Sequence, residues 1–314
     1  MRTNIALSLI LTLAIITGQL VRIHVGTNRG LTILEIAVAG LCLLGLFQIK
    51  FKLIRPPVLI KGAIAFITVC SLSLVFTPLH LNTLQYLTAF LYTVRFSIYI
   101  LLGWLLLSGA LISIRENINK ILLFSGIGLA SLGLLQFIFL PDLRFLASFG
   151  WDAHFYRTAS TFLDPNFLGA YLCLTLLLIS QNVLQLKINH RKILFMIVYL
   201  ALMTTFSRSS YGMFLIGSLT LSFFKRSVKL VFLTIILFIL LLVSFQIYIR
   251  AVNQVTPLDR DQTASYRLIT WQQGLEIFMK SPVLGVGFNT YSFALRQYKL
   301  GDEQRALKDA EAAN

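Results

Sequence analysis

Long apolar runs separated by short polar turns dominate the hydrophobic pattern of this chain. A helix needs roughly 20 mostly apolar residues to cross a bilayer, at a rise of about 1.5 Å per residue. Windows near this length recur from the first residues to about residue 250 and then stop. They predict about nine transmembrane helices, over residues 5–22, 31–49, 58–76, 84–112, 121–140, 166–186, 193–206, 209–224 and 228–249.

This pattern predicts an all-α, polytopic integral membrane bundle. Of the 314 residues, 57% are hydrophobic and 12% are charged, which is more apolar than a soluble core requires. We expect the transmembrane bundle over 1–249, with one polar loop at 141–165. The region 250–314 is expected to be a separate extracytoplasmic segment with an amphipathic helix. We also expect this region to be incomplete, as in a C-terminally truncated chain.

The positive charges of the chain indicate which side of the membrane each turn faces. The formal net charge is +15, and basic clusters gather at the turns near residues 50–61, 115–120, 187–192 and 225–229. The intervening turn 77–83, TPLHLNT, has no lysine or arginine. The positive-inside rule therefore predicts a cytoplasmic N-terminus, with 141–165 and everything after Arg250 outside. This distribution indicates the lipid bilayer as a partner and no nucleic acid.

Metal and nucleotide chemistry find no support in the residue pattern. Cys42, Cys70 and Cys173 all fall inside predicted spans, and no carboxylate pair or His/Cys cluster has metal-ligand spacing. No Gly-rich phosphate loop lies on the cytoplasmic side. We therefore expect no metal and no cofactor.

Four arginines are the candidate functional residues. Arg95 lies in a predicted span, about 16 Å below its outer end, where it either pairs with Glu35 or serves an anion site. Arg208, in TTFSRSSYG, is read either as part of a capped helix end beside Ser207 or as a phosphate contact. Arg157 and Arg267 lie on the predicted outer side near aromatic residues. Converging guanidinium groups can hold a diphosphate without a metal ion.

Two further segments face the predicted outer side. In DPN, Asp164 favours a turn, Pro165 suits a first helical position, and Asn166 places an amide at the start of the next span. Thr158, Ser160 and Thr161 fit either loop packing or recognition of sugar hydroxyls. The run 265–279 places Tyr266, Ile269, Leu275 and Phe278 on one helical stripe, which predicts a helix lying on the outer membrane surface.

Three elements of this chain together resemble the O-antigen ligase and polymerase superfamily. They are RTASTFLDPNFLGAYL, TTFSRSSYGMFL and SYRLITWQQGLEIFMKSPVLGVGFNTY, in family order and with family spacing across roughly 90–292. The resemblance implies a membrane glycosyltransferase of the bacterial inner membrane with an extracytoplasmic active site. Its partners would be a polyprenyl-diphosphate-linked glycan donor and a glycan or glycolipid acceptor.

The resemblance also assigns roles to residues. It implies that Arg157 and Arg267 grip the donor diphosphate, with Arg208 and Arg95 in support. Asn166, Ser207, Tyr266 and Trp271 are the expected substrate contacts. Many relatives carry a His-Asn pair after the G-x-G turn, and no histidine follows Gly287 here. The outward candidates for the base are His154, Asp152, Asp164 and Glu276, and His154 has the most suitable ordinary pKa.

Two other classes of function stay open at the level of sequence. A flippase for lipid-linked oligosaccharides would also line a cavity with arginine, but it should carry charges in several spans. A non-catalytic component of a polysaccharide assembly complex would need no convergent arginines. The sequence does not separate ligase from polymerase activity.

Overall fold

A computed structural model gives the fold of the chain. It describes residues 2–24, 30–50, 52, 55–149, 151–182, 185, 187–255 and 260–300. Within these ranges, the side chains of residues 2–5, 24, 253–255 and 260–267 lie outside the described part.

A helix is found at every predicted apolar window. The described residues contain α1 (Arg2–Thr17), α2 (Ile33–Gln48), α3 (Val58–Val75), α4 (Thr83–Ser108), α5 (Ile112–Phe139), α6 (Pro165–Ser180), α7 (Ile188–Thr204), α8 (Arg208–Phe224) and α9 (Val228–Val255). Such helices satisfy their own backbone groups, as a chain in lipid must. The helices α3, α4, α5 and α9 are long and apolar enough to cross a membrane. The chain is therefore a mostly helical multi-pass membrane protein, and the count of nine spans stays a prediction.

The structure corrects the sequence prediction between the first two helices. The window 5–22 is too long, because α1 ends at Thr17 and Gly18 turns the chain with a positive φ of 54°. Residues Arg22–His24 (β1) and Gly30–Thr32 (β2) then pair as a two-stranded antiparallel hairpin. The hairpin is a short addition to a mostly helical chain, so the all-α class predicted from the sequence is supported. The helix predicted over 121–140 also begins earlier, at Ile112.

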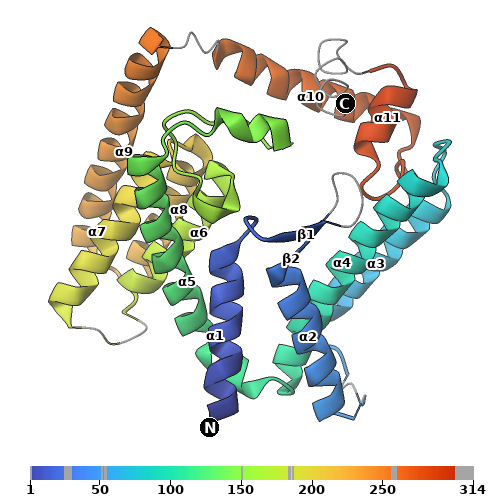
Figure 1. Cartoon of the computed structure of the whole chain (residues 1–314), viewed down its shortest axis with the longest axis horizontal. Helices are drawn as coiled ribbons and strands as arrows, with labels where there is room; N and C mark the ends of the chain where they lie inside the picture. Colours follow the sequence, from blue (N-terminus) through green and yellow to red (C-terminus); the bar gives the residue numbers. More distant parts are fainter. Residues whose placement is uncertain are drawn as a thin grey trace. The chain divides into compact units, whose positions relative to one another are not determined.

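The helices fall into two compact units. Unit 1 comprises Met1–Ala37 and Ser113–Leu258, and unit 2 comprises Val38–Ile112 and Asp259–Asn314. In unit 1, α6 packs on α7 and α8, and α8 packs on α9 (Figure 1). The core of unit 1 lies between these helices and includes the fully covered side chains of Leu168, Leu172, Val198, Leu202 and Tyr211.

Unit 2 contains the antiparallel pair α3 and α4 and two helices from the C-terminal region (Figure 1). A capping box of Asn82 and Gln85 begins α4, and Gly109 ends it in the left-handed conformation. The C-terminal helices are α10 (Arg260–Lys280) and α11 (Tyr291–Gln297). Leu79, Ile277, Val286 and Ala294 form a small apolar core that joins them to the turn between α3 and α4.

Candidate functional site

The segment around Arg157 is bonded along the C-terminal end of α7. The Thr158 amide donates to the Thr204 carbonyl over 2.9 Å, and the two threonine hydroxyls are 2.7 Å apart. Arg157 Nε donates to the Thr205 carbonyl over 2.9 Å, and Nη2 reaches the Phe206 carbonyl at 3.5 Å. Arg157 therefore satisfies helix-end carbonyls, and its positive charge also suits the negative end of the α7 dipole.

Two helices begin beside this arginine. Asp164 Oδ1 accepts from the Asn166 and Phe167 amides, with Pro165 as the first residue of α6. These contacts confirm the helix start that the DPN sequence predicts. Ser207 caps α8 by accepting from the Ser210 amide, and Arg208 is the first residue of α8. One of the two interpretations of Arg208, that it belongs to a capped helix end beside Ser207, is therefore confirmed.

The starts of α6 and α8 are joined directly. Ser207 Oγ donates to Asn166 Oδ1 over 2.8 Å, and Ser210 Oγ donates to Ser207 Oγ over 2.9 Å. A Cβ on Gly169 would lie 2.2 Å from Ser210 Oγ, so only glycine lets the two helices approach this closely. The positive ends of two helix dipoles therefore meet at one place, which favours an anion. We call Arg157, Asn166, Ser207 and Arg208 the α6–α8 site.

Arg208 is the exposed charge of the α6–α8 site. Its guanidinium carbon lies 5.9 Å from the centre of the Phe245 ring in α9, within cation–π range. Asn166 is also exposed, whereas Ser207 is buried and Arg157 is half-buried. The site thus presents positive charge and an amide at its surface over a framework of buried hydroxyls.

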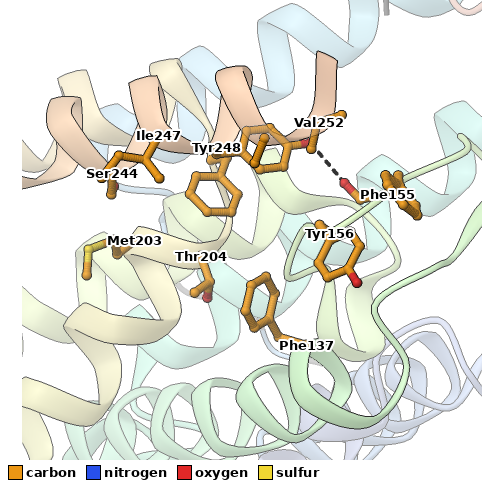
Figure 2. Close-up of a pocket in the computed structure, with 11 residues that line it drawn as sticks. Phe137, Phe155, Tyr156, Met203, Thr204, Ser244, Ile247, Tyr248 and Val252 are labelled. Carbon is orange, nitrogen blue, oxygen red and sulfur yellow. Dashed lines mark hydrogen bonds between the residues drawn. The ribbon is translucent and has the colours of Figure 1, made fainter. Parts of the chain in front are cut away.

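An apolar pocket of about 460 Å³ adjoins the same segments. In Figure 2 the rings of Phe137 and Tyr156 lie on one side and α9 on the other, with Ile247, Tyr248 and Val252 facing the space. Tyr248 donates to the Phe155 carbonyl over 2.8 Å and stacks on Phe206 at 4.0 Å between ring centres. Tyr156 and Phe206 line the pocket, and the Phe206 carbonyl also accepts from Arg157. The positive charge of Arg157 therefore lies next to the apolar pocket.

Two non-glycine residues beside the α6–α8 site have strained backbones. Tyr156 and Phe206 both have a φ of 48°, in the left-handed region that large side chains rarely adopt. Such strain persists only where surrounding contacts fix it, and it gathers at functional sites. Tyr156 comes directly before Arg157, and Phe206 comes directly before Ser207.

Gln136 in α5 is a supporting residue that the sequence did not reveal. Its Oε1 accepts from the Ala159 amide at 2.9 Å, and its Nε2 donates to the Arg157 carbonyl at 3.3 Å. No local signal marks Gln136, because it lies within an apolar run 21 residues before Arg157.

The threonine and serine residues of the same segment serve loop packing. Besides Thr158, Ser160 donates to the Leu129 carbonyl and Thr161 to the Ile16 carbonyl, and all three residues are buried. Of the two readings that the sequence allowed, the packing role is the one these contacts support.

His154 is buried within the loop 141–165 rather than presented to the surface. Its side chain is 7% exposed, and its Nε2 has no hydrogen-bond partner among the described residues. Burial, aided by the nearby Arg157 charge, lowers the pKa of His154 to about 4, against the raising effects of Asp152 and Asp164. Its role as general base stays a prediction, and it would require the loop to open.

The candidates Arg95, Tyr266, Arg267 and Trp271 belong to unit 2, whereas Glu35 belongs to unit 1. Arg95 is half-buried in α4, with its guanidinium carbon 5.8 Å from the Tyr92 ring centre. Trp271 in α10 is exposed, and the side chains of Tyr266 and Arg267 lie outside the described residues. Glu35 Oε2 accepts from the Thr32 amide at the start of α2. The structure thus brings Arg157 and Arg208 together, while the gathering of all four arginines and the Glu35–Arg95 pair stay predictions.

No group of three histidine, cysteine, aspartate or glutamate side chains suited to a metal ion occurs within the described part of the chain. Metal independence stays a prediction, since it concerns the reaction rather than this arrangement.

Comparison with known proteins gives one family. Residues 193–309 match the model of the O-antigen ligase family. No curated protein and no solved structure matches the chain. The matched residues contain the second and third of the family-like elements, and the first element, with Arg157 and Asn166, is bonded to the second through Thr205, Phe206 and Ser207. The resemblance found in the motifs is thereby confirmed over residues 193–309, which match the O-antigen ligase family.

Proposed function

We propose that this protein is a membrane glycosyltransferase that moves a glycan from a polyprenyl diphosphate to a sugar hydroxyl in the assembly of cell-surface polysaccharide. One observation carries the proposal: the starts of α6 and α8 meet next to an apolar pocket, and Arg157 and Arg208 lie at this place. Residues 193–309 of the same chain match the O-antigen ligase family. A lipid diphosphate has the matching chemistry, because it combines a compact anion with a long apolar chain.

The α6–α8 site would bind the diphosphate. Arginine forks suit phosphate oxygens, and the free amides at helix starts favour negative charge. Arg208 is exposed beside the Ser207 cap, so it can close on the anion from the surface. Asn166 can add an amide donor, since its Oδ1 already accepts from Ser207. The apolar pocket would take the first isoprenoid units of the carrier.

The reaction needs stabilisation of the leaving group above all. The bond from the sugar C1 to the diphosphate oxygen breaks, a new bond forms from C1 to the acceptor oxygen, and the acceptor proton passes to a base. Charge grows on the departing diphosphate, where the arginines and helix starts would stabilise it. Arg267, Arg95, Tyr266 and Trp271 are proposed to contact the substrates as well.

We further propose the bacterial inner membrane as the location, with the N-terminus in the cytoplasm and the α6–α8 site on the extracytoplasmic side. The alternating basic turns support this orientation. The polyprenyl carrier and its acceptor would meet at that surface without a nucleotide.

A transfer assay tests the proposed function. Purified protein, a synthetic polyprenyl-diphosphate sugar and a glycan acceptor are combined without nucleotide, and glycosidic product is measured. We expect turnover by the wild type and none by Arg157→Ala or Arg267→Ala, with insertion into the membrane intact. Movement of the lipid across vesicles without bond exchange would instead identify a flippase, and neither turnover nor donor binding would leave only a non-catalytic role.

A further inference from the structure

The helix α10 packs into unit 2 by one face. Tyr291 OH donates to the Thr270 carbonyl over 3.1 Å, Gln273 Nε2 donates to the Leu300 carbonyl, and Ile277 is 5% exposed in the small core with Leu79. Lys280 Nζ lies 4.4 Å from the Tyr298 ring centre. These positions, 270, 273, 277 and 280, follow helical spacing and define the packed face.

The opposite face of α10 is apolar and exposed. Helical spacing places the next residues on one stripe that turns away from the packed face. These residues are Leu268 (57% exposed), Trp271 (66%), Leu275 (43%), Phe278 (56%) and Met279 (65%). We call these five residues the α10 stripe. It shares Leu275 and Phe278 with the stripe expected from the sequence, whereas Ile269 lies to its side and Tyr266 has no described side chain.

The segment that follows α10 contacts α4 and the turn between α3 and α4, which are two helices long and apolar enough to cross a membrane. Thr77, in the turn between the spans α3 and α4, donates to the Val286 carbonyl, and His80 N donates to Gln297 Oε1 over 3.0 Å. Phe288 then packs against Phe96, 6.3 Å between ring centres, near the middle of α4. The segment that follows α10 therefore lies against α4, a helix long and apolar enough to cross a membrane.

The α10 stripe also continues into further exposed apolar surface. Val283, which is 89% exposed, lies between the stripe and the Gly285–Gly287 turn, and a Cβ on Gly287 would lie 3.4 Å from Thr77 Oγ1. At the same end of α3, Val75 and Phe76 are 62% and 64% exposed. Helices that lie at membrane interfaces typically expose an apolar face that includes tryptophan. The α10 stripe has this composition, with Trp271 as its tryptophan.

We propose that α10 lies in the headgroup layer of the bilayer, with the α10 stripe in contact with lipid acyl chains and its packed face on α11. The occupant of the stripe is thus the lipid surface itself. This inference is independent of glycan transfer, because it rests only on packing and exposure within unit 2.

The position of Trp271 tests the proposal in the full chain. Trp104→Phe and Trp151→Phe leave Trp271 as the single indole, and the protein is reconstituted in phosphatidylcholine vesicles whose lipids carry bromine near the glycerol end or near the methyl end of the acyl chains. We expect the Trp271 fluorescence to be blue-shifted and to be quenched strongly by the shallow bromines. The deep bromines should quench it less, and aqueous iodide should quench it little.

A matched control places the indole off the stripe. Glu276 pairs with Lys280 at 3.8 Å on the side of the helix, so Glu276→Trp in a chain with all three native indoles replaced by phenylalanine should respond to iodide and not to bromolipids. If the double substitution fails to fold, the difference between wild type and Trp271→Phe spectra reports the same residue.

Three results would overturn the proposal. Quenching of Trp271 by iodide alone would place the stripe in water. Quenching by neither agent would show that protein covers the stripe. Strongest quenching by the deep bromines would place α10 inside the hydrocarbon layer rather than at its surface.

Discussion

The α6–α8 site and the α10–α11 region hold their parts together in different ways. The first is joined by hydroxyls, an amide and helix caps, with Ser207 bonded to Asn166 and Arg157 bonded to the end of α7. The second is joined by an apolar core of Leu79, Ile277, Val286 and Ala294. Polar bonding fixes charged groups in one geometry, whereas apolar packing fixes a helix and leaves its other face for lipid. The two regions should therefore respond differently to substitution.

Removing the guanidinium of Arg157 should have the largest effect. We expect Arg157→Ala to lower transfer on the order of a hundredfold or more, as loss of one preorganised donor does at other charge-stabilising sites. Arg157→Lys should restore little of the transfer activity, because an ammonium group cannot donate two parallel hydrogen bonds to a phosphate as a guanidinium group does. The matched control is Arg144→Ala, since Arg144 lies in the same loop but pairs with Asp142 at 2.7 Å. Equal losses in both variants would refute a specific role for Arg157.

Truncating Ile277 should loosen only the α10–α11 region. Ile277→Ala leaves a cavity in the small core and should cost about 2–5 kcal/mol of local stability. Hydrogen exchange should rise over residues 268–300 and stay unchanged at the start of α8. Leu268→Ala is the control, because Leu268 is 57% exposed and packs on no protein core. A rise that spreads to α6 and α8 would show that the two regions unfold together.

Adding one methyl group at Gly169 should separate the starts of α6 and α8. A Cβ there meets Ser210 Oγ at 2.2 Å, so Gly169→Ala should lower the free energy of unfolding by about 1–3 kcal/mol and reduce transfer. Gly212→Ala in α8 is the control, since a Cβ there meets nothing within 4 Å and alanine favours a helix. Thermal unfolding in detergent should lower Tm for the first variant alone.

Acid should open the loop over His154. Its pKa is lowered from 6.5 to about 4 on folding, so the open state takes up the proton first, and stability present above pH 6.5 is lost as pH falls toward 4. At pH 5 the loss is about 2 kcal/mol. Hydrogen exchange across 141–164 should quicken from pH 7 to pH 5, and His154→Gln should remove that dependence. An unchanged pH response in His154→Gln would assign the effect elsewhere.

Filling the apolar pocket should give the smallest effect. Ala251→Trp places an indole in the space and should raise KM for a long-chain donor about tenfold, equivalent to about 1.4 kcal/mol, with kcat little changed. A donor with a short lipid should be affected less. Ile236→Trp, on the same helix but outside the pocket lining, is the control. Equal KM values for both donors in Ala251→Trp would show that no carrier lipid enters the pocket.

The sequence predicted the features that depend on local pattern. Apolar windows found the positions of α1 to α9, because lipid-facing helices expose such side chains throughout their length. Asp164 and Pro165 marked the start of α6, since a cap acts within its own turn. The hairpin of β1 and β2 was missed because each strand has only three residues, with no clear alternation.

Features that depend on distant contacts could not be predicted. Gly18 ends α1 early where a Cβ would lie 2.5 Å from the Thr161 carbonyl, a contact 143 residues away in the chain. Gln136 shows no motif, although it holds Arg157 and Ala159. The meeting of the α6 and α8 helix starts depends on Gly169 facing Ser210, and no spacing rule in one sequence gives that pairing.

Donor affinity tests the central claim most directly. Binding of polyprenyl diphosphate to the purified protein is compared for wild type, Arg157→Ala and Arg144→Ala, without acceptor. Loss of a charged hydrogen-bond donor costs about 1.5–3 kcal/mol, so Arg157→Ala should raise Kd about tenfold or more while Arg144→Ala leaves it unchanged. The same Kd for all three proteins would contradict binding of the diphosphate at the start of α6 and α8.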